Sequence, residues 1–258
     1  MELSKKTAII SGGASGLGRA SALHLAKLGV NIAVFDLDED AGSALAEQLG
    51  SRCARFYKVD VSQEHAVANA IEETVAQFGN LHLCLNCAGI APAKRVLDRD
   101  HRAMPLDDFS RVIGINLIGS FNLARLTAER MAKNTPIGPD RERGIIINTA
   151  SIAAFDGQMG QAAYAASKSG IVGMTLPMAR DLAITGIRVN SIAPGIMGTP
   201  MMEGMPDIVK NNLIAQTQFP KRMGLPEEYA RLVAHICENT YLNGETIRLD
   251  AAVRMPPK

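Results

Sequence analysis

TAIISGGASGLGRASA, residues 7–22, joins a short apolar run to a glycine-rich turn and then to a segment with helical periodicity. Glycine at positions 12, 16 and 18 permits a tight turn and a close approach of the backbone to a pyrophosphate at the N-terminus of the following helix. The spacing is GxxxGxG, which differs from the GxGxxG of the standard dinucleotide fingerprint. The strand before the turn and the amphipathic segment after it nevertheless favour a dinucleotide site at Gly12, Gly16 and Gly18.

Further β-branched runs alternate with segments of helical periodicity along the rest of the chain. The expected strands are residues 7–10, 31–35, 55–59, 81–86, 144–149, 187–192 and 245–249. This alternation predicts βαβ crossovers and a parallel sheet covered by helices on both faces. A chain of 258 residues fits one large α/β domain better than two small ones. We therefore predict a single Rossmann-type domain over 1–258, with a cofactor half in about 1–150 and a catalytic and substrate-binding half in 151–258.

Composition limits the function and the location of the protein. Hydrophobic residues make up 47% of the chain and charged residues 21%, and the net charge of +1 argues against nucleic acid as the main partner. Four scattered cysteines are too few for a disulfide framework, which favours a reducing cytosol. No apolar run has the length of a membrane span, and the N-terminus runs almost directly into the first expected strand. We expect a cytoplasmic protein with a small-molecule substrate and no membrane partner.

Acidic residues follow the second and third expected strands. Asp36 comes eighteen residues after Gly18, where a carboxylate can accept hydrogen bonds from both adenine-ribose hydroxyls and repels a 2′-phosphate. No arginine or lysine is placed to receive that phosphate, so NAD is favoured over NADP. Helix capping is an alternative role for Asp38 but explains Asp36 less well. Asp60 is expected at the edge of the adenine ring or, alternatively, as the cap of a helix that begins near Gln63.

A serine, a tyrosine and a lysine begin the second half of the chain. Ser151 follows a nearly continuous apolar strand, and ligands of an open parallel sheet bind beyond the carboxyl ends of its strands. Tyr164 comes thirteen residues later, and Lys168 lies one helical turn beyond it on the same helix face. We therefore expect Ser151 and the glycine turn at one edge of the sheet, within reach of the helix that carries Tyr164 and Lys168.

Taken together and in order, these motifs resemble the short-chain dehydrogenase/reductase family over essentially the whole chain. The matching features are GGASGLG at 12–18, Asp36, VDV at 59–61, NCAG at 86–89, Asn116 in INLIG, Ser151, Tyr164 with Lys168, and PGIMGTP at 194–200. The resemblance implies a seven-stranded doubly wound fold, a nicotinamide cofactor and a homotetramer. It implies a cofactor site that comprises Gly12, Ser15, Gly16, Leu17, Gly18, Asp36, Asp60, Val61, Cys87, Ala88, Gly89, Tyr164, Lys168, Pro194, Gly195, Met197 and Thr199. It also implies the catalytic residues Asn116, Ser151, Tyr164 and Lys168, and substrate contacts at Ser151, Gln161 and Tyr164.

The chemistry of these side chains agrees with the implied roles. A phenol has a pKa of about 10 and is a poor base at neutral pH. We expect Lys168 and the positive nicotinamide to stabilise the Tyr164 phenolate and so to lower its pKa. Tyr164 then takes the hydroxyl proton as hydride leaves for NAD⁺, or donates it in the reverse reaction, while Ser151 holds the substrate oxygen. Asn116 resembles the family residue that links the lysine to solvent through water.

Finer features resemble the type-2 3-hydroxyacyl-CoA dehydrogenases, which also oxidise hydroxysteroids and other secondary alcohols. They are Pro177 inside the expected catalytic helix, FDGQMGQAAY at 155–164, the proline- and glycine-containing surface loop at 133–144, and LNGETIRLDAAVRM at 242–255. The resemblance implies NAD-dependent oxidation of a 3-hydroxyacyl-CoA to a 3-oxoacyl-CoA. The alternatives are a steroid or other hydrophobic alcohol as substrate, an NADP-linked 3-oxoacyl thioester reductase, and a dinucleotide-sensing or scaffold protein. Asp36 disfavours the reductase, and the complete Ser–Tyr–Lys set disfavours the non-enzyme.

Three other segments leave their roles open. Methionines at 197, 201, 202 and 205 suit either an adaptable lid over an apolar substrate or gap filling in the core. The cations of the segment 94–102 suit coenzyme A phosphates, although a solvated charged loop is the favoured interpretation. Cys84 and Cys87 form a CxxC, but no second pair or nearby histidine completes a metal site, so we expect no metal.

Overall fold

The computed structural model describes residues 1–203 and 207–257. Seven parallel strands form one sheet in the order β3-β2-β1-β4-β5-β6-β7. The strands are β1 (Thr7–Ser11), β2 (Asn31–Asp36), β3 (Ala54–Lys58), β4 (Leu83–Asn86), β5 (Gly144–Thr149), β6 (Ile187–Pro194) and β7 (Thr246–Leu249). The predicted parallel sheet is confirmed, and the predicted strand ends differ from the observed ones by at most two residues.

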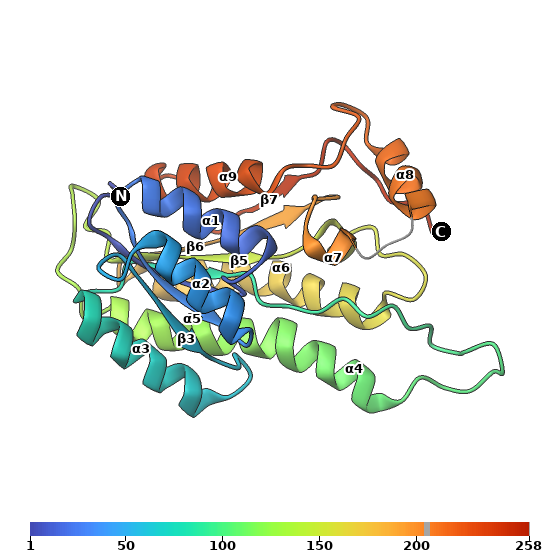
Figure 1. The fold of residues 1–258 in the computed structure, drawn as a ribbon, viewed down its shortest axis with the longest axis horizontal. Helices are drawn as coiled ribbons and strands as arrows, with labels where there is room; N and C mark the ends of the chain where they lie inside the picture. The colour runs from blue at the N-terminus through green and yellow to red at the C-terminus, as the bar shows by residue number, and fades with distance from the viewer. Residues whose placement is uncertain (204–206, 258) are drawn as a thin grey trace.

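Helices cover both faces of the sheet (Figure 1). They are α1 (Gly16–Lys27), α2 (Glu39–Leu49), α3 (Glu64–Phe78), α4 (Leu106–Ile113), α5 (Ser120–Met131), α6 (Ala162–Ala183), α7 (Pro200–Glu203), α8 (Asp207–Gln216) and α9 (Pro226–Glu238), with the π-helical turn η1 (Gly114–Gly119) and the 3-10 turn η2 (Ile152–Ala154). One hydrophobic core lies under α1, α2 and α9 and includes Leu25 and Tyr229. The other lies under α3, α5 and α6 and includes Val67 and Leu123. The sheet separates the two cores, so the fold is doubly wound as predicted.

The order of the strands places the ligand crevice. The chain adds strands outward in one direction from β1 to β3 and in the other from β4 to β7, so the switch point lies between β1 and β4. Ligands of open α/β sheets bind at the carboxyl ends of the strands beside such a point. A polar row crosses the sheet at the level where β1 and β4 end, because Ser11, Asn86, Asn148, Ser191 and Thr246 are in register on neighbouring strands.

Helix α6 carries the predicted Tyr-x-x-x-Lys pattern in its first two turns. It contains Pro177 in its interior, where a proline removes a backbone donor and normally costs about 3 kcal/mol. The helix is nevertheless continuous from Ala162 to Ala183 and packs against β5, β6 and η2. None of the described helices is long and apolar enough to cross a membrane.

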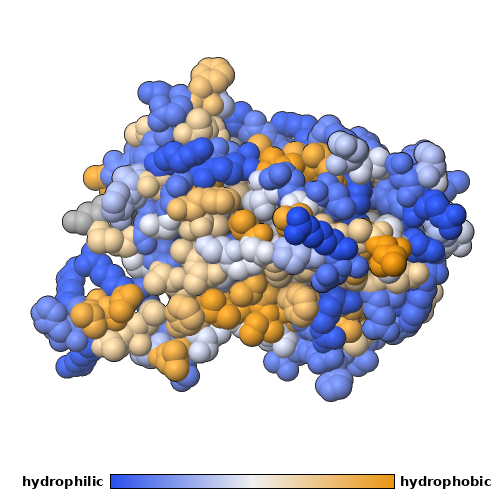
Figure 2. Space-filling model, turned by 180° about the vertical axis from the view of Figure 1, so that it is seen from behind, coloured by the Kyte–Doolittle hydropathy of each residue, from blue (hydrophilic) through white to orange (hydrophobic). Residues whose placement is uncertain are grey.

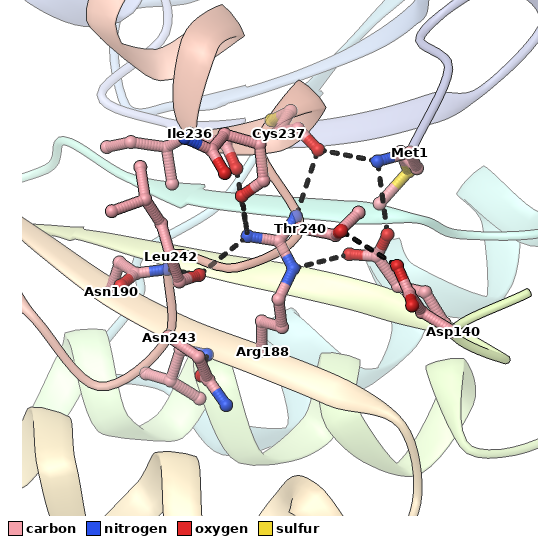
Figure 3. A network of polar contacts seen from close by, with 12 residues as sticks. Met1, Asp140, Arg188, Asn190, Ile236, Cys237, Thr240, Leu242 and Asn243 are labelled. Atoms are coloured by element: carbon pink, nitrogen blue, oxygen red, sulfur yellow. Dashed lines mark hydrogen bonds and ion pairs between the residues drawn. The ribbon is translucent and has the colours of Figure 1, made fainter.

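The loop between α5 and β5 lies on the surface, as predicted, but two of its side chains, Asn134 and Glu142, are buried. Glu142 is 5% exposed and accepts a hydrogen bond from Arg188 Nε of β6 at 2.8 Å. The Arg188 guanidinium also donates to the carbonyls of Ile236 and Cys237 at the end of α9 (Figure 3). The Met1 amino nitrogen donates to the same Cys237 carbonyl at 2.6 Å. The network ties β6, α9 and the surface loop together.

Candidate active site

The glycine turn after β1 approaches the end of β4 very closely. Gly12 has a φ of +62°, and a Cβ atom there would lie 2.7 Å from the backbone nitrogen of Ala88. A Cβ atom at Gly18 would lie 2.2 Å from the carbonyl oxygen of Gly12. Both positions therefore need glycine, the first for its backbone conformation and the second for close helix packing.

The N-terminus of α1 is arranged to bind an anion. Ser15 precedes the helix without capping it through its side chain, and the first turn of this fully described helix carries no acidic residue. The N–H groups of this turn and the helix dipole favour negative charge. Thr199 packs against the turn, since a Cβ atom at Gly16 would lie 3.5 Å from its Cγ2. The segment from Ser15 through Leu17 to Gly18 could hold a diphosphate here.

Asp36 and Asp38 have different partners at the end of β2. The Oδ2 atom of Asp36 accepts a hydrogen bond from Ala14 N at 3.0 Å, which holds this carboxylate against the glycine turn. Asp38 caps α2, because its Oδ1 atom accepts from Ala41 N at 3.0 Å. Helix capping is therefore the role of Asp38, and Asp36 is left facing the turn, where a ribose could lie.

Asp60 is not the N-cap of α3, so that expected alternative is wrong. Its Oδ1 accepts from Ser62 N at 2.9 Å and from Ser62 Oγ at 2.7 Å, and Gln63 occupies the N-cap position. The next residue, Val61, is buried, and its carbonyl accepts from Asn122 Nδ2 at 2.9 Å. Asp60 is half-buried at the same edge of the sheet as Asp36, as an adenine contact requires.

Ser151, Tyr164 and Lys168 meet where β5 ends and α6 begins. Lys168 Nζ lies 5.8 Å from the centre of the Tyr164 ring and donates a hydrogen bond to the Thr149 carbonyl at 2.7 Å. Ser151 starts η2, where its Oγ accepts from Ala153 N at 3.1 Å. The Ser151 side chain lies within hydrogen-bond reach of the Tyr164 hydroxyl. The structure therefore brings together the serine, tyrosine and lysine that the sequence predicts as neighbours.

The pKa values of Tyr164 and Lys168 reflect the burial of both side chains. Burial raises the pKa of Tyr164 above its usual value, and the hydrogen bond with Ser151 opposes this shift. Burial lowers the pKa of Lys168 to about 8, and the Cys87 thiol opposes that shift. The Lys168 ammonium lies over the Tyr164 ring and donates to the Thr149 carbonyl, and the lowering of the Tyr164 pKa by Lys168 together with the nicotinamide stays a prediction. At pH 7 the protein alone holds a neutral phenol beside a mostly protonated amine.

Asn116 lies in η1, the π-helical turn between α4 and α5, and such turns are frequent at functional sites. Its Nδ2 donates to Ile90 O at 2.9 Å and to Ser167 Oγ at 3.1 Å, while its Oδ1 accepts from Ile90 N at 2.8 Å. A Cβ atom at Gly89 would lie 3.2 Å from Asn116 Oδ1 and 3.7 Å from Lys168 Nζ. Asn116 and Lys168 therefore flank the same glycine, and the amide is fixed between the end of β4 and α6.

A groove of about 450 Å³ lies beside the start of α6. Its walls are residues 94–97 and 157–162, and Lys94 N donates to Gly160 O at 2.8 Å across them. Gln161 lines the groove three residues before Tyr164, and its Oε1 accepts from Gln158 N at 3.0 Å. The groove lies along the first turn of α6, and the substrate contact expected at Gln161 stays a prediction.

The loop 94–102 is exposed, as its charge predicts. Lys94 forms an ion pair with Asp108 of α4. The three arginines of this loop have no carboxylate partner within the part of the chain that the structure describes; they are Arg95, Arg99 and Arg102.

The methionine segment is partly core. Met197 is 5% exposed and packs in the core under α9, so gap filling, not a lid, is its role. Met202 is half-buried against Ile152. The side chain of Met201 and all of Met205 lie outside the described residues. The predicted cofactor residues of this segment follow β6 toward the glycine turn; they are Pro194, Gly195, Met197 and Thr199.

Two residues at the centre of the site belong to none of the motifs. The Tyr229 hydroxyl, on α9, lies 2.7 Å from Thr149 Oγ1 and 3.8 Å from Cys87 Sγ. Thr149 Oγ1 also lies 2.5 Å from the carbonyl oxygen of Asn86. A tyrosine in an amphipathic helix cannot be told from a core residue in one sequence. For Thr149 the sequence does contain a signal, because the apolar strand IIINT ends in two polar residues at the edge of the sheet where ligands bind.

The two cysteines of the CxxC are neutral thiols. Burial raises the pKa of Cys84 to about 12 and also raises the pKa of Cys87. Thiolates are the metal-binding and nucleophilic form of cysteine. Across residues 1–203 and 207–257, no group of three His, Cys, Asp or Glu side chains is placed to hold a metal ion.

The chain matches known proteins over nearly its whole length. A family model described as Enoyl-(Acyl carrier protein) reductase matches residues 12–253. The 3-hydroxyacyl-CoA dehydrogenase type-2 of Bos taurus is 52% identical over 251 residues, which cover 97% of this chain and 95% of that protein. The 3-oxoacyl-acyl-carrier-protein reductase of Thermotoga maritima is 30% identical over 257 residues, or 98% of this chain and 99% of that protein.

A solved structure gives the same result. The crystal structure of 3-hydroxyacyl-CoA dehydrogenase type-2 from Mycobacterium avium is similar with a TM-score of 0.94 at 42% sequence identity, and the match covers 98% of this chain and 97% of that one. The family match includes the glycine turn, Ser151, Tyr164 and Lys168. The chain is an oxidoreductase of the short-chain dehydrogenase/reductase family.

Proposed function

We propose that this chain is an NAD-dependent dehydrogenase that oxidises the secondary alcohol of a 3-hydroxyacyl-CoA to the 3-oxoacyl-CoA. The observation that carries the proposal is that Ser151, Tyr164 and Lys168 meet where β5 ends and α6 begins. A groove of about 450 Å³ lies along the first turn of α6 and is lined by Gln161. The thioester substrate is supported by the Bos taurus relative, which is 52% identical and is a 3-hydroxyacyl-CoA dehydrogenase type-2.

The residues around the glycine turn fit a dinucleotide. A side chain at Gly12 or Gly18 would clash with backbone, and α1 presents its N-terminus without a side-chain cap. Asp36 faces this turn and favours a free ribose over a 2′-phosphate. When bound, NAD⁺ supplies the hydride acceptor. The remaining residues proposed to hold it are Ser15, Gly16, Leu17, Asp60, Val61, Cys87, Ala88, Gly89, Tyr164, Lys168, Pro194, Gly195, Met197 and Thr199.

Tyr164 is the proposed general base of oxidation and the general acid of reduction. Ser151 holds the substrate oxygen beside the Tyr164 hydroxyl, and Gln161 lines the substrate groove. The phenolate oxygen takes the alcohol proton as the neighbouring C–H bond gives up its hydride. Burial opposes ionisation of Tyr164, so the positive charge of Lys168 and of the oxidised cofactor must offset it. Asn116 fixes the end of β4 next to Lys168.

A substrate panel tests this proposal. NADH formation from NAD⁺ is measured with short and long 3-hydroxyacyl-CoA thioesters, a 17β-hydroxysteroid and a simple secondary alcohol. We expect the highest kcat/KM with the thioesters. Activity on the non-thioester alcohols alone would keep the dehydrogenase and refute the thioester. No turnover of any alcohol, with NADH still bound, would favour a dinucleotide-sensing protein.

Asp36→Ala is expected to reduce the preference for NAD⁺ over NADP⁺ by about tenfold or more, because it removes charge-assisted hydrogen bonds to the ribose and repulsion of a 2′-phosphate. The measurement is the ratio of kcat/KM values for the two cofactors. Asp38→Ala is the matched control, because Asp38 caps α2 and contacts Ala41. The control should lose about 1 kcal/mol of stability and keep the cofactor ratio. An unchanged ratio in Asp36→Ala would exclude the proposed role.

We also propose that the chain forms a homotetramer in the cytoplasm. Ile118, Phe121 and Leu176 are 56%, 46% and 44% exposed on η1, α5 and α6, and Figure 2 shows apolar side chains gathered across the rear face. A second copy of the chain would cover such a surface. All four cysteines are free thiols, which suits a reducing compartment. Sedimentation equilibrium should give four times the chain mass of 27.5 kDa, and a single-chain mass at micromolar concentration would contradict the tetramer.

A further inference from the structure

A buried hydrogen-bonded cluster beneath Lys168 joins α9 to the ends of β4 and β5. Tyr229 is fully buried, and its hydroxyl lies 2.7 Å from Thr149 Oγ1. Thr149 Oγ1 in turn lies 2.5 Å from the Asn86 carbonyl oxygen and 3.4 Å from Cys87 Sγ. Because α9 and α6 pack on opposite faces of the sheet, Tyr229 reaches the site from the side opposite Tyr164.

The donors and acceptors of this cluster can be assigned. A threonine hydroxyl has one proton, and a carbonyl oxygen can only accept. The short contact with Asn86 O therefore takes the Thr149 proton. The Tyr229 hydroxyl must then be the donor to Thr149 Oγ1, so the phenol fixes the threonine side chain in one orientation.

The same threonine holds Lys168 through its backbone. Its carbonyl accepts from Lys168 Nζ at 2.7 Å, and this is the hydrogen bond that the described residues provide for the buried ammonium. A buried ammonium is costly unless it is hydrogen-bonded. The position of the Thr149 peptide therefore matters both for the location of Lys168 and for its charge.

We propose that Tyr229 is a positioning residue: its hydroxyl fixes Thr149, and through the Thr149 carbonyl it holds the Lys168 ammonium beside Tyr164. The inference rests on the proposed function, because Lys168 affects turnover in this way only if Tyr164 carries the proton. Tyr229 itself touches neither the phenol oxygen of Tyr164 nor the substrate groove, so it acts through the side chains that its hydroxyl contacts: Thr149 at 2.7 Å and, more weakly, Cys87 at 3.8 Å.

The titratable groups around Lys168 set the direction of the expected change. They are the Cys87 thiol at the end of β4, the Tyr164 phenol on α6 and the Tyr229 phenol on α9. Burial keeps the pKa of each of these groups raised, so all three are neutral near pH 7. Loosening Thr149 should therefore make protonation of Lys168 harder and weaken the positive charge that favours the Tyr164 phenolate.

Tyr229→Phe tests the inference with little change in side-chain volume. We expect the acidic limb of kcat for alcohol oxidation to move up by about 0.5 to 1 pH unit, so that kcat at pH 7 falls about three- to tenfold and recovers at high pH. The melting temperature should fall by no more than about 5 °C. In protein with ¹³C-labelled lysine, the Lys168 resonance, identified by its loss in Lys168→Met, should titrate at lower pH than in the wild type.

Three further variants separate positioning from general disruption. Thr149→Val removes the threonine hydroxyl and should shift the acidic limb of kcat as Tyr229→Phe does. Thr149→Ser keeps a hydroxyl at this position and should keep the wild-type pH profile. Tyr57→Phe removes another buried phenol, on β3, and should leave the profile unchanged. Wild-type pH profiles and Lys168 titration in Tyr229→Phe would overturn the inference. If Tyr164→Phe retains turnover, the proposed function fails; if it does not and Tyr229→Phe matches wild type, only the positioning role fails.

Discussion

Tyr164→Phe is expected to lower kcat for alcohol oxidation by about a thousandfold, because the ring remains but the group that carries the proton is gone. The dissociation constant for NADH should change by less than about threefold, since the phenol contributes little to cofactor binding compared with the glycine turn and Asp36. Stopped-flow NADH formation gives the first quantity, and quenching or enhancement of NADH fluorescence gives the second. A loss in kcat without a loss in binding is the signature of a group that acts in the transition state.

The matched control is Tyr241→Phe. Tyr241 is 99% exposed and far from the start of α6 in sequence, so the loss of its hydroxyl should change neither kcat nor NADH binding. If Tyr164→Phe keeps a tenth or more of the wild-type turnover, another group or solvent carries the proton. If it loses turnover and NADH binding together, Tyr164 contributes mainly to cofactor binding, and the expected separation of kcat from binding is refuted.

The features that could be predicted from the sequence are local in the chain. The strand runs have continuous apolar character, and β5 was predicted with both ends correct at Gly144 and Thr149. The glycine turn was recognisable because a strand, three spaced glycines and a helix follow one another within sixteen residues. Tyr164 and Lys168 were placed together because the helical repeat alone puts positions i and i+4 on one face. Parallel strands then bring their carboxyl ends to a common edge.

The features that were missed depend on contacts between distant parts of the chain. Thr149 and Tyr229 are 80 residues apart, and nothing in either neighbourhood indicates that their hydroxyls meet. The sequence does not show how deeply the Tyr164 ring is buried, and this burial, which raises the pKa of Tyr164 in the protein alone, is the sum of all the elements around the ring. Met197 belongs to a methionine-rich segment whose composition suits a lid. The course of the chain after β6 nevertheless packs Met197 in the core under α9. Such effects are set by tertiary packing.

Arg188 gives the largest stability effect that we expect outside the active site. Arg188→Met should lower the free energy of unfolding by about 3 kcal/mol, because it takes the guanidinium partner from the buried Glu142 carboxylate, which among the described residues then keeps only the Met1 amino group, 3.1 Å from its Oε2. Arg188 is 7% exposed and Glu142 is 5% exposed, so water cannot replace the lost hydrogen bond at 2.8 Å. The carbonyls of Ile236 and Cys237 also lose donors. Urea unfolding followed by circular dichroism, at one fixed protomer concentration, measures the change.

A surface pair and a double variant distinguish the cost of a broken buried pair from the cost of losing any arginine. Arg125 pairs with Glu64 at 2.7 Å, but both side chains are well exposed, so Arg125→Met should barely move the urea midpoint. Arg188→Met combined with Glu142→Met should recover only part of the stability lost in Arg188→Met, because the buried Met1 amino group, 3.1 Å from Glu142 Oε2, then keeps only the Cys237 carbonyl as a partner in the part of the chain that the structure describes. If the double variant is instead less stable than Arg188→Met, Glu142 stabilises the fold through the Met1 amino group even without the guanidinium. If Arg188→Met itself costs no more stability than Arg125→Met, the network is not a stabilising element of the fold.

Whatever the effect on stability, kcat of the folded fraction should stay near wild type. Arg188 lies at the amino-terminal end of β6, whereas the reacting groups lie at the carboxyl ends of the strands.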